Sequence, residues 1–436
     1  MKGKPASIIL LFLLFVSSLL LVHNVQPVKA SGTISINADG SINPPTAPIS
    51  TSDNVTYTFT DNITDSIYVL RDNATIDGNG YTLQGSYSER EICGLVLLAN
   101  FVKVKNTRID SWYVGLSIGE TNEPGYTFLT WGNTIANNSI AGCIVGISII
   151  VEPYLGSPWD YPVWEYCPHL VVSNTIWGNY FGIIFTNDIN ISMHITVFHN
   201  DFINNSLQAA NYPGTVNVWD DGYPSGGNYW SNYKGVDVKS GPNQDQPGSD
   251  GIGDMPYIID ANNSDNYPLM PHDVAVTSVV AERAWVCQGF IAHVNVTVLD
   301  KGRDENATVT LYYNITANGV IGAQNVTILA GENETLSFVW DTTGVPYNQN
   351  YTLTAVATIP IDNNPADNTL AGGPITVRIM GDINGDGKVD GKDIAIAAKA
   401  FGTVPGDPRW NLDCDINGDG KVDGKDIVLV ARNFGK

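Results

Sequence analysis

Between residues about 50 and 210 the chain carries short apolar segments that recur with a fixed order of polar and small residues between them. When residues 138–149 are aligned under residues 174–185, the Asn, Ile, Gly, Gly and Ile positions coincide. Residues 106–118 fit this pattern with one extra residue, and residues 200–209 fit it more loosely. Short strands with Asn at the turns, recurring every ~20 to 40 residues, are typical of a solenoid whose rungs bury their apolar faces against each other. The stacked Asn side chains are therefore predicted to hydrogen-bond along the solenoid and to be structural, not catalytic.

Two segments interrupt the repeat, residues 120–132 and 152–169, and are too long to be corners of rungs. We expect both to leave the solenoid as loops. The second is rich in aromatic rings, with Trp159, Trp164 and Tyr166 among several acids. Its rings either pack on the solenoid or form a platform for sugar rings or a protein partner, because exposed aromatic patches tend to mark binding surfaces.

From Trp219 the rungs give way to a turn-rich segment, and a covering segment is expected there because the open end of a solenoid exposes its core. It contains the run Gly-Gly-Asn-Tyr-Trp-Ser at residues 226–231 and Asp-Gly-Ile-Gly-Asp at residues 250–254. Asp250 and Asp254 are read either as ligands of a further calcium ion or as solvated turn acids. With this cap, residues 50–270 resemble right-handed parallel β-helix proteins of the NosD-like and pectate-lyase-like kind.

From His272 the apolar positions alternate at period two, the pattern of half-buried strands. The alternating segments are residues 273–280, 291–298, 307–313, 325–329, 336–340, 351–357 and 375–379. About seven strands in about 105 residues is the size of an immunoglobulin-like β-sandwich. The pattern resembles the CARDB (cell-adhesion-related) family, which implies a spacer or a binding module.

At the C-terminal end, residues 382–394 recur without a change as residues 415–427. Each copy places oxygen-bearing side chains at loop positions 1, 3, 5, 9 and 12 and a glycine at position 6, which is the spacing of a calcium loop. Position 7 contributes only its main-chain carbonyl. The predicted calcium ligands are Asp382, Asn384, Asp386, Lys388, Asp390 and Asp393 in the first loop, and Asp415, Asn417, Asp419, Lys421, Asp423 and Asp426 in the second.

A helix is predicted after each loop, because Ile394, Ala397, Ala398 and Phe401 have helical spacing and Gly402 follows as a stop signal. The second copy repeats this pattern up to Phe434. Two calcium loops, each with only its exiting helix, resemble the type I dockerin family over residues 379–436. The resemblance implies two bound calcium ions and a cohesin-domain partner. Loop positions 10 and 11 would contact that partner, and here they are Gly391, Lys392, Gly424 and Lys425.

Composition agrees with an exported protein. The chain has 436 residues, a net charge of −22 and a pI near 4.4, which argues against nucleic acid as a ligand. Residues 1–30 have the basic start, apolar run and small-x-small end of a signal peptide, although a retained N-terminal anchor is the alternative. No later stretch is expected to span a membrane. About a dozen Asn-x-Ser/Thr sequons would be usable on such a chain, and the five scattered cysteines allow no disulfide or zinc site to be argued.

The expected architecture is thus mainly β: a signal peptide (1–30), a capped parallel β-helix (31–271), a CARDB-like sandwich (272–378) and a small α-helical dockerin (379–436). We interpret the protein as a secreted or cell-surface module that binds carbohydrate or a partner through its β-helix and docks through calcium. The alternative is a polysaccharide lyase or glycoside hydrolase, and fold alone does not decide between them. A hydrolase needs two carboxyls about 5 to 10 Å apart. No motif pairs the candidate acids Glu120, Glu123, Glu152, Asp160, Glu165 and Asp188, which favours a protein that is not an enzyme.

Overall fold

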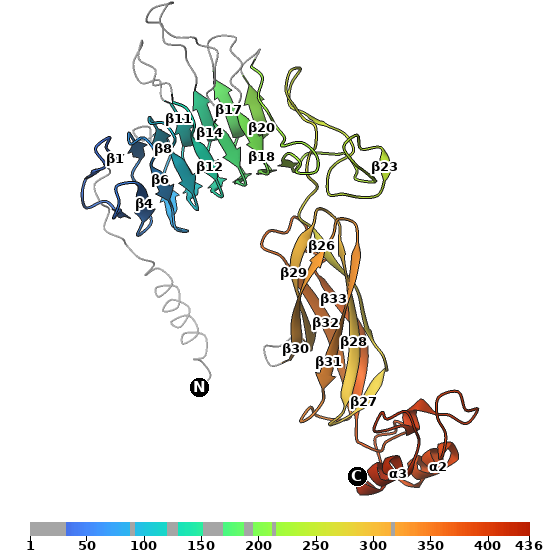
Figure 1. The fold of residues 1–436 in the computed structure, drawn as a ribbon. Helices are drawn as coiled ribbons and strands as arrows, with labels where there is room; N and C mark the ends of the chain where they lie inside the picture. Colours follow the sequence, from blue (N-terminus) through green and yellow to red (C-terminus); the bar gives the residue numbers. More distant parts are fainter. Residues whose placement is uncertain are drawn as a thin grey trace, which may run out of the picture. The chain divides into compact units, whose positions relative to one another are not determined.

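The structure is a computed structural model that describes residues 32–87, 92–119, 130–150, 169–186, 195–211, 215–314 and 319–436. Its elements are almost all strands, with two short helices near the C-terminal end (Figure 1). Contacts divide the chain into two units, one of residues 1–219 and 259–263 and the other of residues 220–258 and 264–436. The bounds of the four predicted segments remain predictions.

The first unit is a parallel β-helix built from three sheets. One sheet runs β2-β1-β5-β8-β11-β14-β17-β20, a second runs β18-β15-β12-β9-β6-β4-β3, and a third includes β19-β16-β13-β10-β7. Beyond the N-terminal pairs β1–β2 and β3–β4, neighbouring strands in these sheets are parallel. One strand from each sheet makes a rung, as β12, β13 and β14 do, and the next rung follows in sequence order (Figure 1).

The strand bounds in the first sheet are β1 Ile34–Ile36, β2 Ile42–Asn43, β5 Ile67–Val69, β8 Cys93–Leu97, β11 Val114–Ile118, β14 Val145–Ile150, β17 Phe181–Thr186 and β20 Leu207–Asn211. In the second they are β3 Ile49–Ser50, β4 Thr56–Phe59, β6 Thr75–Asp77, β9 Lys103–Lys105, β12 Thr134–Ala136, β15 Leu170–Val172 and β18 Thr196–Phe198. In the third they are β7 Thr82–Gln84, β10 Arg108–Asp110, β13 Ser139–Ala141, β16 Thr175–Trp177 and β19 Asp201–Ile203.

The register of the rungs confirms the alignment of residues 138–149 with residues 174–185, since Ser139 pairs with Thr175 and Val145 with Phe181. The preceding rung corrects one detail. Arg108 pairs with Ser139 and Val114 with Val145, so Thr107, not Asn106, is equivalent to Asn138 and no extra residue is present. Asn106 instead matches Asn137, and both adopt a left-handed backbone conformation, with φ of 52° and 57°. Asn tolerates that conformation at a corner better than most residues do.

The predicted asparagine ladder is present in the core of the solenoid. Asn138 Nδ2 donates to Asn174 Oδ1 at 3.0 Å, and Asn174 Nδ2 donates to Asn200 Oδ1 at 2.9 Å. Each Oδ1 also accepts the main-chain N–H at the equivalent position of the preceding rung, as Asn174 Oδ1 does from Asn138. A buried amide must have its hydrogen bonds satisfied, and the stack satisfies them from rung to rung. The ladder is therefore a structural element, as the sequence predicts.

Residues 220–258 and 264–271 form a turn-rich segment with very short strands, β21 Tyr229–Trp230, β22 Lys239–Ser240, β23 Gln246–Pro247, β24 Tyr257–Ile258 and β25 Ser264–Asp265. It is organised around the buried carboxylate of Asp265, which accepts the main-chain N–H groups of Asn228 and Tyr267 and the indole N–H of Trp230. Burial, the largest influence, raises the pKa of Asp265 to about 7. Asp250 and Asp254 accept loop N–H groups, as turn acids do.

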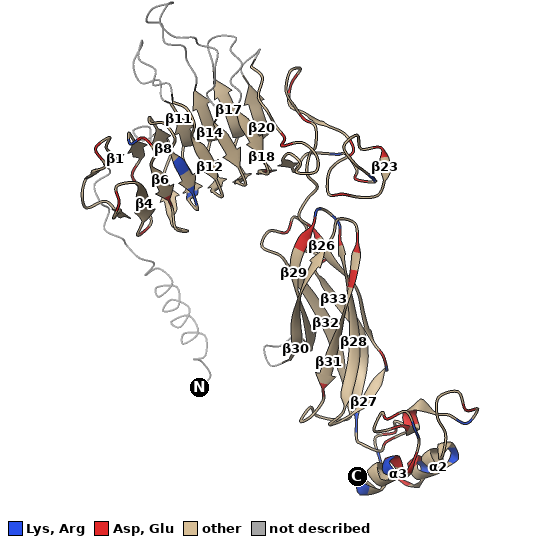
Figure 2. Cartoon of the chain, viewed as in Figure 1, with Lys and Arg blue, Asp and Glu red and all other residues tan. Residues whose placement is uncertain are grey.

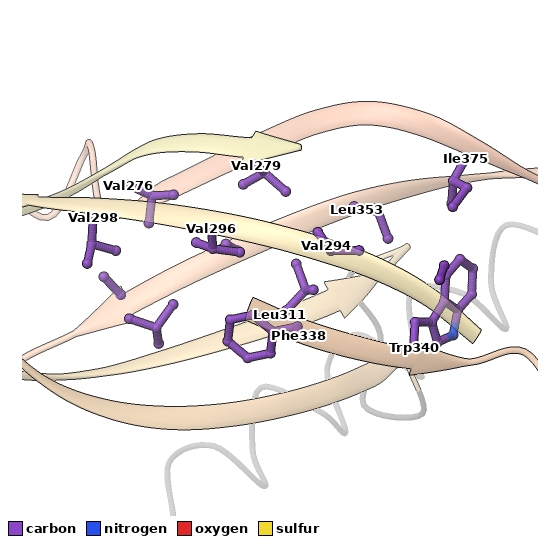
Figure 3. Packing of buried hydrophobic residues seen from close by; sticks show 14 of the residues in the cluster. Val276, Val279, Val294, Val296, Val298, Leu311, Phe338, Trp340, Leu353 and Ile375 are labelled. Carbon is purple, nitrogen blue, oxygen red and sulfur yellow. The ribbon is translucent and has the colours of Figure 1, made fainter. Parts of the chain in front are cut away.

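The sandwich has eight strands in two sheets, β26-β28-β31 and β27-β33-β32-β29-β30. Their bounds are β26 Val274–Ala281, β27 Trp285–Cys287, β28 Ile291–Asp300, β29 Glu305–Tyr313, β30 Val320–Ile328, β31 Asn333–Asp341, β32 Gln349–Thr358 and β33 Thr369–Arg378. The short β27 is a strand that the alternation pattern does not predict. Inward residues of both sheets, among them Val296, Leu311 and Phe338, interdigitate between the layers (Figure 3).

The C-terminal helices are α2, Gly391–Ala400, and α3, Gly424–Arg432, with the short 3-10 helix η1, Leu412–Cys414, between them. They share a small core with the predicted loop residues Ile383, Val389, Ile416 and Val422. One prediction fails here. Phe401 and Phe434 lie beyond the helix ends and are exposed, so Ala397, Ala400 and Val430 provide the buried helix contacts.

Candidate calcium loops and docking surface

The first loop, residues 382–393, wraps around two buried carboxylates at its two ends. Asp382 Oδ1 accepts the N–H of Gly385 at 2.8 Å, and its Oδ2 accepts the N–H of Gly387 at 2.9 Å. Asp393 Oδ1 accepts the N–H groups of Ile383 and Asn384 at 2.9 and 3.1 Å. These hydrogen bonds bring positions 1 and 12 to the same side of the loop.

The second loop, residues 415–426, repeats this arrangement. Asp415 accepts the N–H groups of Asp419 at 3.1 Å and of Gly420 at 2.9 Å. Asp426 Oδ1 accepts the N–H of Ile416 at 2.9 Å. Both carboxylates are buried. The identical sequences thus fold into the same local structure twice.

The glycine at position 6 is needed for the turn of each loop. Gly387 and Gly420 have φ of 84° and 79°, in the left-handed region where a side chain is strained. The prediction that the chain turns sharply at this position is confirmed.

The last loop residues also start the helices. Asp390 and Asp423 are the N-caps of α2 and α3, and their side chains accept the N–H groups of Lys392 and Lys425. The side chains of Asp393 and Asp426 in turn accept the main-chain N–H of the N-cap residue, which completes a capping box in each helix. Positions 9 and 12 are therefore held in place by the helix start, so the loop and its helix form one unit.

Electrostatics make the loops suited to a cation. Burial, and then the nearby charge of Asp393, raises the pKa of Asp382. Two carboxylates that face each other inside a loop repel unless a positive charge lies between them. The predicted positions offer Asp and Asn side-chain oxygens and the main-chain carbonyls of Lys388 and Lys421, and oxygen is the ligand atom that calcium prefers. Among the residues that the structure describes, no three His, Cys, Asp or Glu side chains are gathered closely enough to hold a metal ion, so the full ligand set remains a prediction.

The four residues predicted to contact a partner, Gly391, Lys392, Gly424 and Lys425, are all exposed at the starts of α2 and α3. The structure adds a contact that spacing does not reveal. Lys425 Nζ lies 2.9 Å from Asp419 Oδ2, and Lys392 Nζ lies 3.5 Å from Asp386 Oδ2. The hydrogen bond from Lys425 lowers the pKa of Asp419, and the same bond raises the pKa of Lys425. In both loops, position 11 therefore pairs with the carboxylate at position 5.

Other predicted sites lie outside the described residues. These are the aromatic platform of Trp159, Trp164 and Tyr166, and the candidate catalytic acids Glu120, Glu123, Glu152, Asp160, Glu165 and Asp188. Both hypotheses stay predictions. Among the helices that the structure describes, none has the length and apolarity to span a membrane.

Comparison with protein families agrees with this geometry at the C-terminal end, where residues 380–435 match the family model of the dockerin type I domain. The chain carries a type I dockerin domain. Dockerin domains of this type bind calcium, which accounts for the acidic loops. The match covers both loops and both helices, α2 and α3.

A second family matches within the solenoid. Residues 165–235 match the model described as periplasmic copper-binding protein (NosD), and the described part of this range holds the strands from β15 to β21. Part of the β-helix is thus similar to the NosD family, and the C-terminal end is similar to the type I dockerin domain. Copper binding is named in the description of that family and is not assigned to this chain.

Among solved structures, the chain is similar to the CARDB domain of a Pyrococcus furiosus protein in complex with di-metal ions, with 20% identity over 25% of this chain and 89% of that chain, and a TM-score of 0.21. It is also similar to a domain of a putative cell surface protein from Methanosarcina acetivorans, with 21% identity over 25% of this chain and 93% of that chain, and a TM-score of 0.21. A third similar structure is a β-glucosidase from Erythrobacter marinus, with 18% identity over 30% of this chain and 20% of that chain, and a TM-score of 0.19. No curated protein matches the chain.

Proposed function

We propose that this is an exported or cell-surface protein that attaches, through its calcium-loaded dockerin, to a cohesin-bearing assembly. Its β-helix is the module that the dockerin attaches to the assembly. This module binds a carbohydrate or a protein partner. The observation that carries the proposal is the duplicated loop, because each copy holds two buried carboxylates beside an exposed Gly-Lys pair at a helix start.

Two calcium ions would be held by the six predicted positions of each loop: Asp382, Asn384, Asp386, Lys388, Asp390 and Asp393 in one, and Asp415, Asn417, Asp419, Lys421, Asp423 and Asp426 in the other. Calcium supplies the positive charge that offsets the repulsion between the loop acids. The chain's own contribution is to position the carboxylates, through the loop N–H groups and the capping boxes.

Calcium binding would also prepare the partner surface. In the structure, Lys392 and Lys425 pair with Asp386 and Asp419. Both acids are predicted ligands, so an ion that takes their oxygens competes with the lysines for them. The two lysine side chains, already largely exposed, then become available to an acidic receptor.

Because the two loop-helix copies are nearly identical, they offer the same chemistry twice, and either copy could dock. We therefore expect Lys392→Glu alone to weaken cohesin binding only about twofold, or ~0.4 kcal/mol, since half of the binding modes remain. Lys425→Glu should have the same effect. The double variant places a like charge in both modes and should cost several kcal/mol.

Titration calorimetry of the full chain with a cohesin domain, in calcium and in chelator, tests this proposal. Binding should occur only with calcium. Lys388→Glu and Lys421→Glu, at exposed loop positions that contribute only a carbonyl, are matched controls for charge and should leave the affinity close to that of the wild type. A single variant at Lys392 or Lys425 that abolishes binding would show that one copy alone docks, and binding that persists in chelator would contradict the calcium requirement.

A further inference from the structure

One edge of the β-helix has a repeating corner that leads from the β10, β13 and β16 strands into β11, β14 and β17. Each corner has three residues, and they play the same roles in successive rungs. The first has a left-handed backbone, with φ from 60° to 64°: Ser111, Gly142 and Gly178. The second is buried in the core: Trp112, Cys143 and Asn179. The third is exposed: Tyr113, Ile144 and Tyr180.

The third residues form a straight column along the solenoid. The N–H that follows Ile144 donates to the carbonyl of Tyr113 at 2.8 Å, and the N–H that follows Tyr180 donates to the carbonyl of Ile144 at 2.8 Å. Ile92 holds the equivalent place one rung earlier, since Val114 N–H donates to its carbonyl at 2.9 Å. Adjacent strands are ~4.8 Å apart, so Ile92, Tyr113, Ile144 and Tyr180 span ~14 Å. Tyrosine and isoleucine alternate along the column, which places the two tyrosines two rungs apart.

Two more exposed aromatic residues occur near these corners. Trp177 lies three residues before Tyr180, at the end of β16, and pairs in register with Ala141. Tyr87 donates its hydroxyl hydrogen bond to the carbonyl of Gly142, which holds its ring against the corner. We call Tyr87, Tyr113, Ile144, Trp177 and Tyr180 the corner surface. Their exposed fractions are 47%, 43%, 40%, 43% and 57%, so all five side chains are open to solvent.

The distribution of lysine and arginine limits the kinds of ligand that the corner surface can bind. No lysine or arginine lies between Arg108 and Lys234, so the corners at Tyr113, Ile144 and Tyr180 and the strands that follow them carry none, whereas Lys103, Lys105 and Arg108 belong to the strands before the first corner. Figure 2 shows no blue on strands β11, β14, β17 and β20. The polar groups beside the rings are acceptors and hydroxyls, among them Asp110 and Ser139, whose Oγ accepts from the Trp177 indole at 3.4 Å. Such a surface repels polyanions and offers hydrogen bonds to hydroxyl groups.

We propose that the corner surface binds a neutral, extended polysaccharide, of the β-1,4-linked kind, that lies along the solenoid axis. An aromatic face is electron-rich and attracts the C–H bonds on the flat face of a sugar ring. A β-1,4-linked chain turns the same face in one direction at every second sugar, and this repeat is close to the distance between two rungs. The column matches it with a tyrosine at every second rung. A repeating surface suits a repeating ligand, whereas a folded protein partner presents no such period.

This inference rests on the proposed function, in which the β-helix is the binding module attached through the dockerin. It adds the class of ligand that this module binds. The test titrates the full chain with cellohexaose, mannohexaose and a polygalacturonate oligomer, followed by tryptophan fluorescence and calorimetry. We expect binding of at least one neutral hexaose and not of the polyanion. Tyr180→Ala and Trp177→Ala should each weaken that binding about tenfold, as the loss of one stacking contact does.

Matched variants distinguish the loss of a stacking contact on the corner surface from the loss of an aromatic ring elsewhere on the solenoid. Trp131→Ala removes a tryptophan of the same solenoid that is 42% exposed and lies off the corner surface, and it should leave sugar affinity unchanged. Tyr180→Phe keeps the ring and should retain most of the binding. The inference is overturned if neither hexaose binds, if Trp131→Ala weakens binding as much as Trp177→Ala, or if only the polygalacturonate binds. Cohesin binding in calcium is measured on the same samples, so a failure here is distinguished from a failure of docking.

Discussion

At the scale of single residues, His169 shows how a substitution within a ladder changes chemistry without changing geometry. In the preceding rung the side-chain oxygen of Asn133 accepts the main-chain N–H of Val102 at 2.8 Å. In the next rung His169 takes the same role, because its Nδ1 accepts the N–H of Asn133 at 3.2 Å. An acceptor Nδ1 requires an unprotonated nitrogen, so the ladder needs this histidine to be neutral.

We therefore predict that His169 makes the β-helix sensitive to acid. Burial lowers the pKa of His169 from 6.5 to about 4 in the folded state. The unfolded chain takes up the proton first as pH falls below about 6.5, so this contribution to stability is full at pH 7 and is lost as pH falls toward about 4. The loss between pH 7 and pH 5 should be about 2 kcal/mol of the free energy of unfolding.

Urea unfolding of the wild type and of His169→Asn at pH 7 and pH 5 measures this. Asn is the residue that the ladder uses at the preceding position, so the variant keeps an acceptor and removes the titration. The difference between the two proteins should be larger by about 2 kcal/mol at pH 5 than at pH 7, in favour of the variant. An equal difference at both pH values would mean that His169 does not carry the effect.

At the scale of elements, the asparagine ladder links three rungs through donors and acceptors that must alternate. Asn174 Nδ2 donates to the carbonyls of Ile135 at 2.8 Å and Val172 at 3.1 Å, while its Oδ1 accepts from Asn138. A carboxylate of the same size would place an oxygen against both carbonyls. The ladder thus depends on the identity of the amide and not on its volume.

Asn174→Asp should accordingly destabilise the β-helix by about 3 kcal/mol or more, since donors are replaced by a buried charge. Thermal unfolding at neutral pH provides the measurement. Asn137→Asp is the matched control, because Asn137 is exposed and its left-handed backbone also accepts Asp. If both changes cost the same, charge at the corner and not the ladder would be responsible.

At the scale of the whole molecule, calcium should act on one part of the chain and leave the rest unchanged. The dockerin core is small and relies on Ile383, Val389, Val422 and Val430 beside the loop acids. Repulsion between those acids opposes the closed loops when the ion is removed. The β-helix has its own ladders and a continuous apolar core that do not involve the loops.

Hydrogen exchange of the full chain, with calcium and with chelator, should show this division. Chelation should remove protection from α2 and α3 and leave the amides of β11, β14 and β17 protected. Cys287, at the end of the sandwich, belongs to the same apolar cluster as the dockerin residues and should lose part of its protection. Unchanged exchange in both helices would contradict the coupling of calcium to folding, and loss of protection in the β-helix would contradict its independence.

Features whose cause is local spacing follow from the sequence alone. The predicted calcium ligands, the glycine turn and the helix start all lie within one short loop, so their order along the chain implies their arrangement in space. The pairing of residues 138–149 with residues 174–185 also follows from the sequence. Residues of the same type recur there at a constant spacing, so the two rungs must pair in that register. Alternation likewise predicted most strands of the sandwich.

Which side chains share a surface depends on contacts between distant segments. Tyr113 and Tyr180 are separated by two rungs of different length, so no sequence period brings them into one column, whereas the parallel register does. Phe401 and Phe434 have helical spacing and yet are exposed, because burial depends on what another segment covers. The contacts of Lys392 and Lys425 with Asp386 and Asp419 form only once each loop has turned back on itself. The spacing of residues along the chain specifies local geometry. Contacts between distant segments specify which side chains are buried and which share an exposed surface.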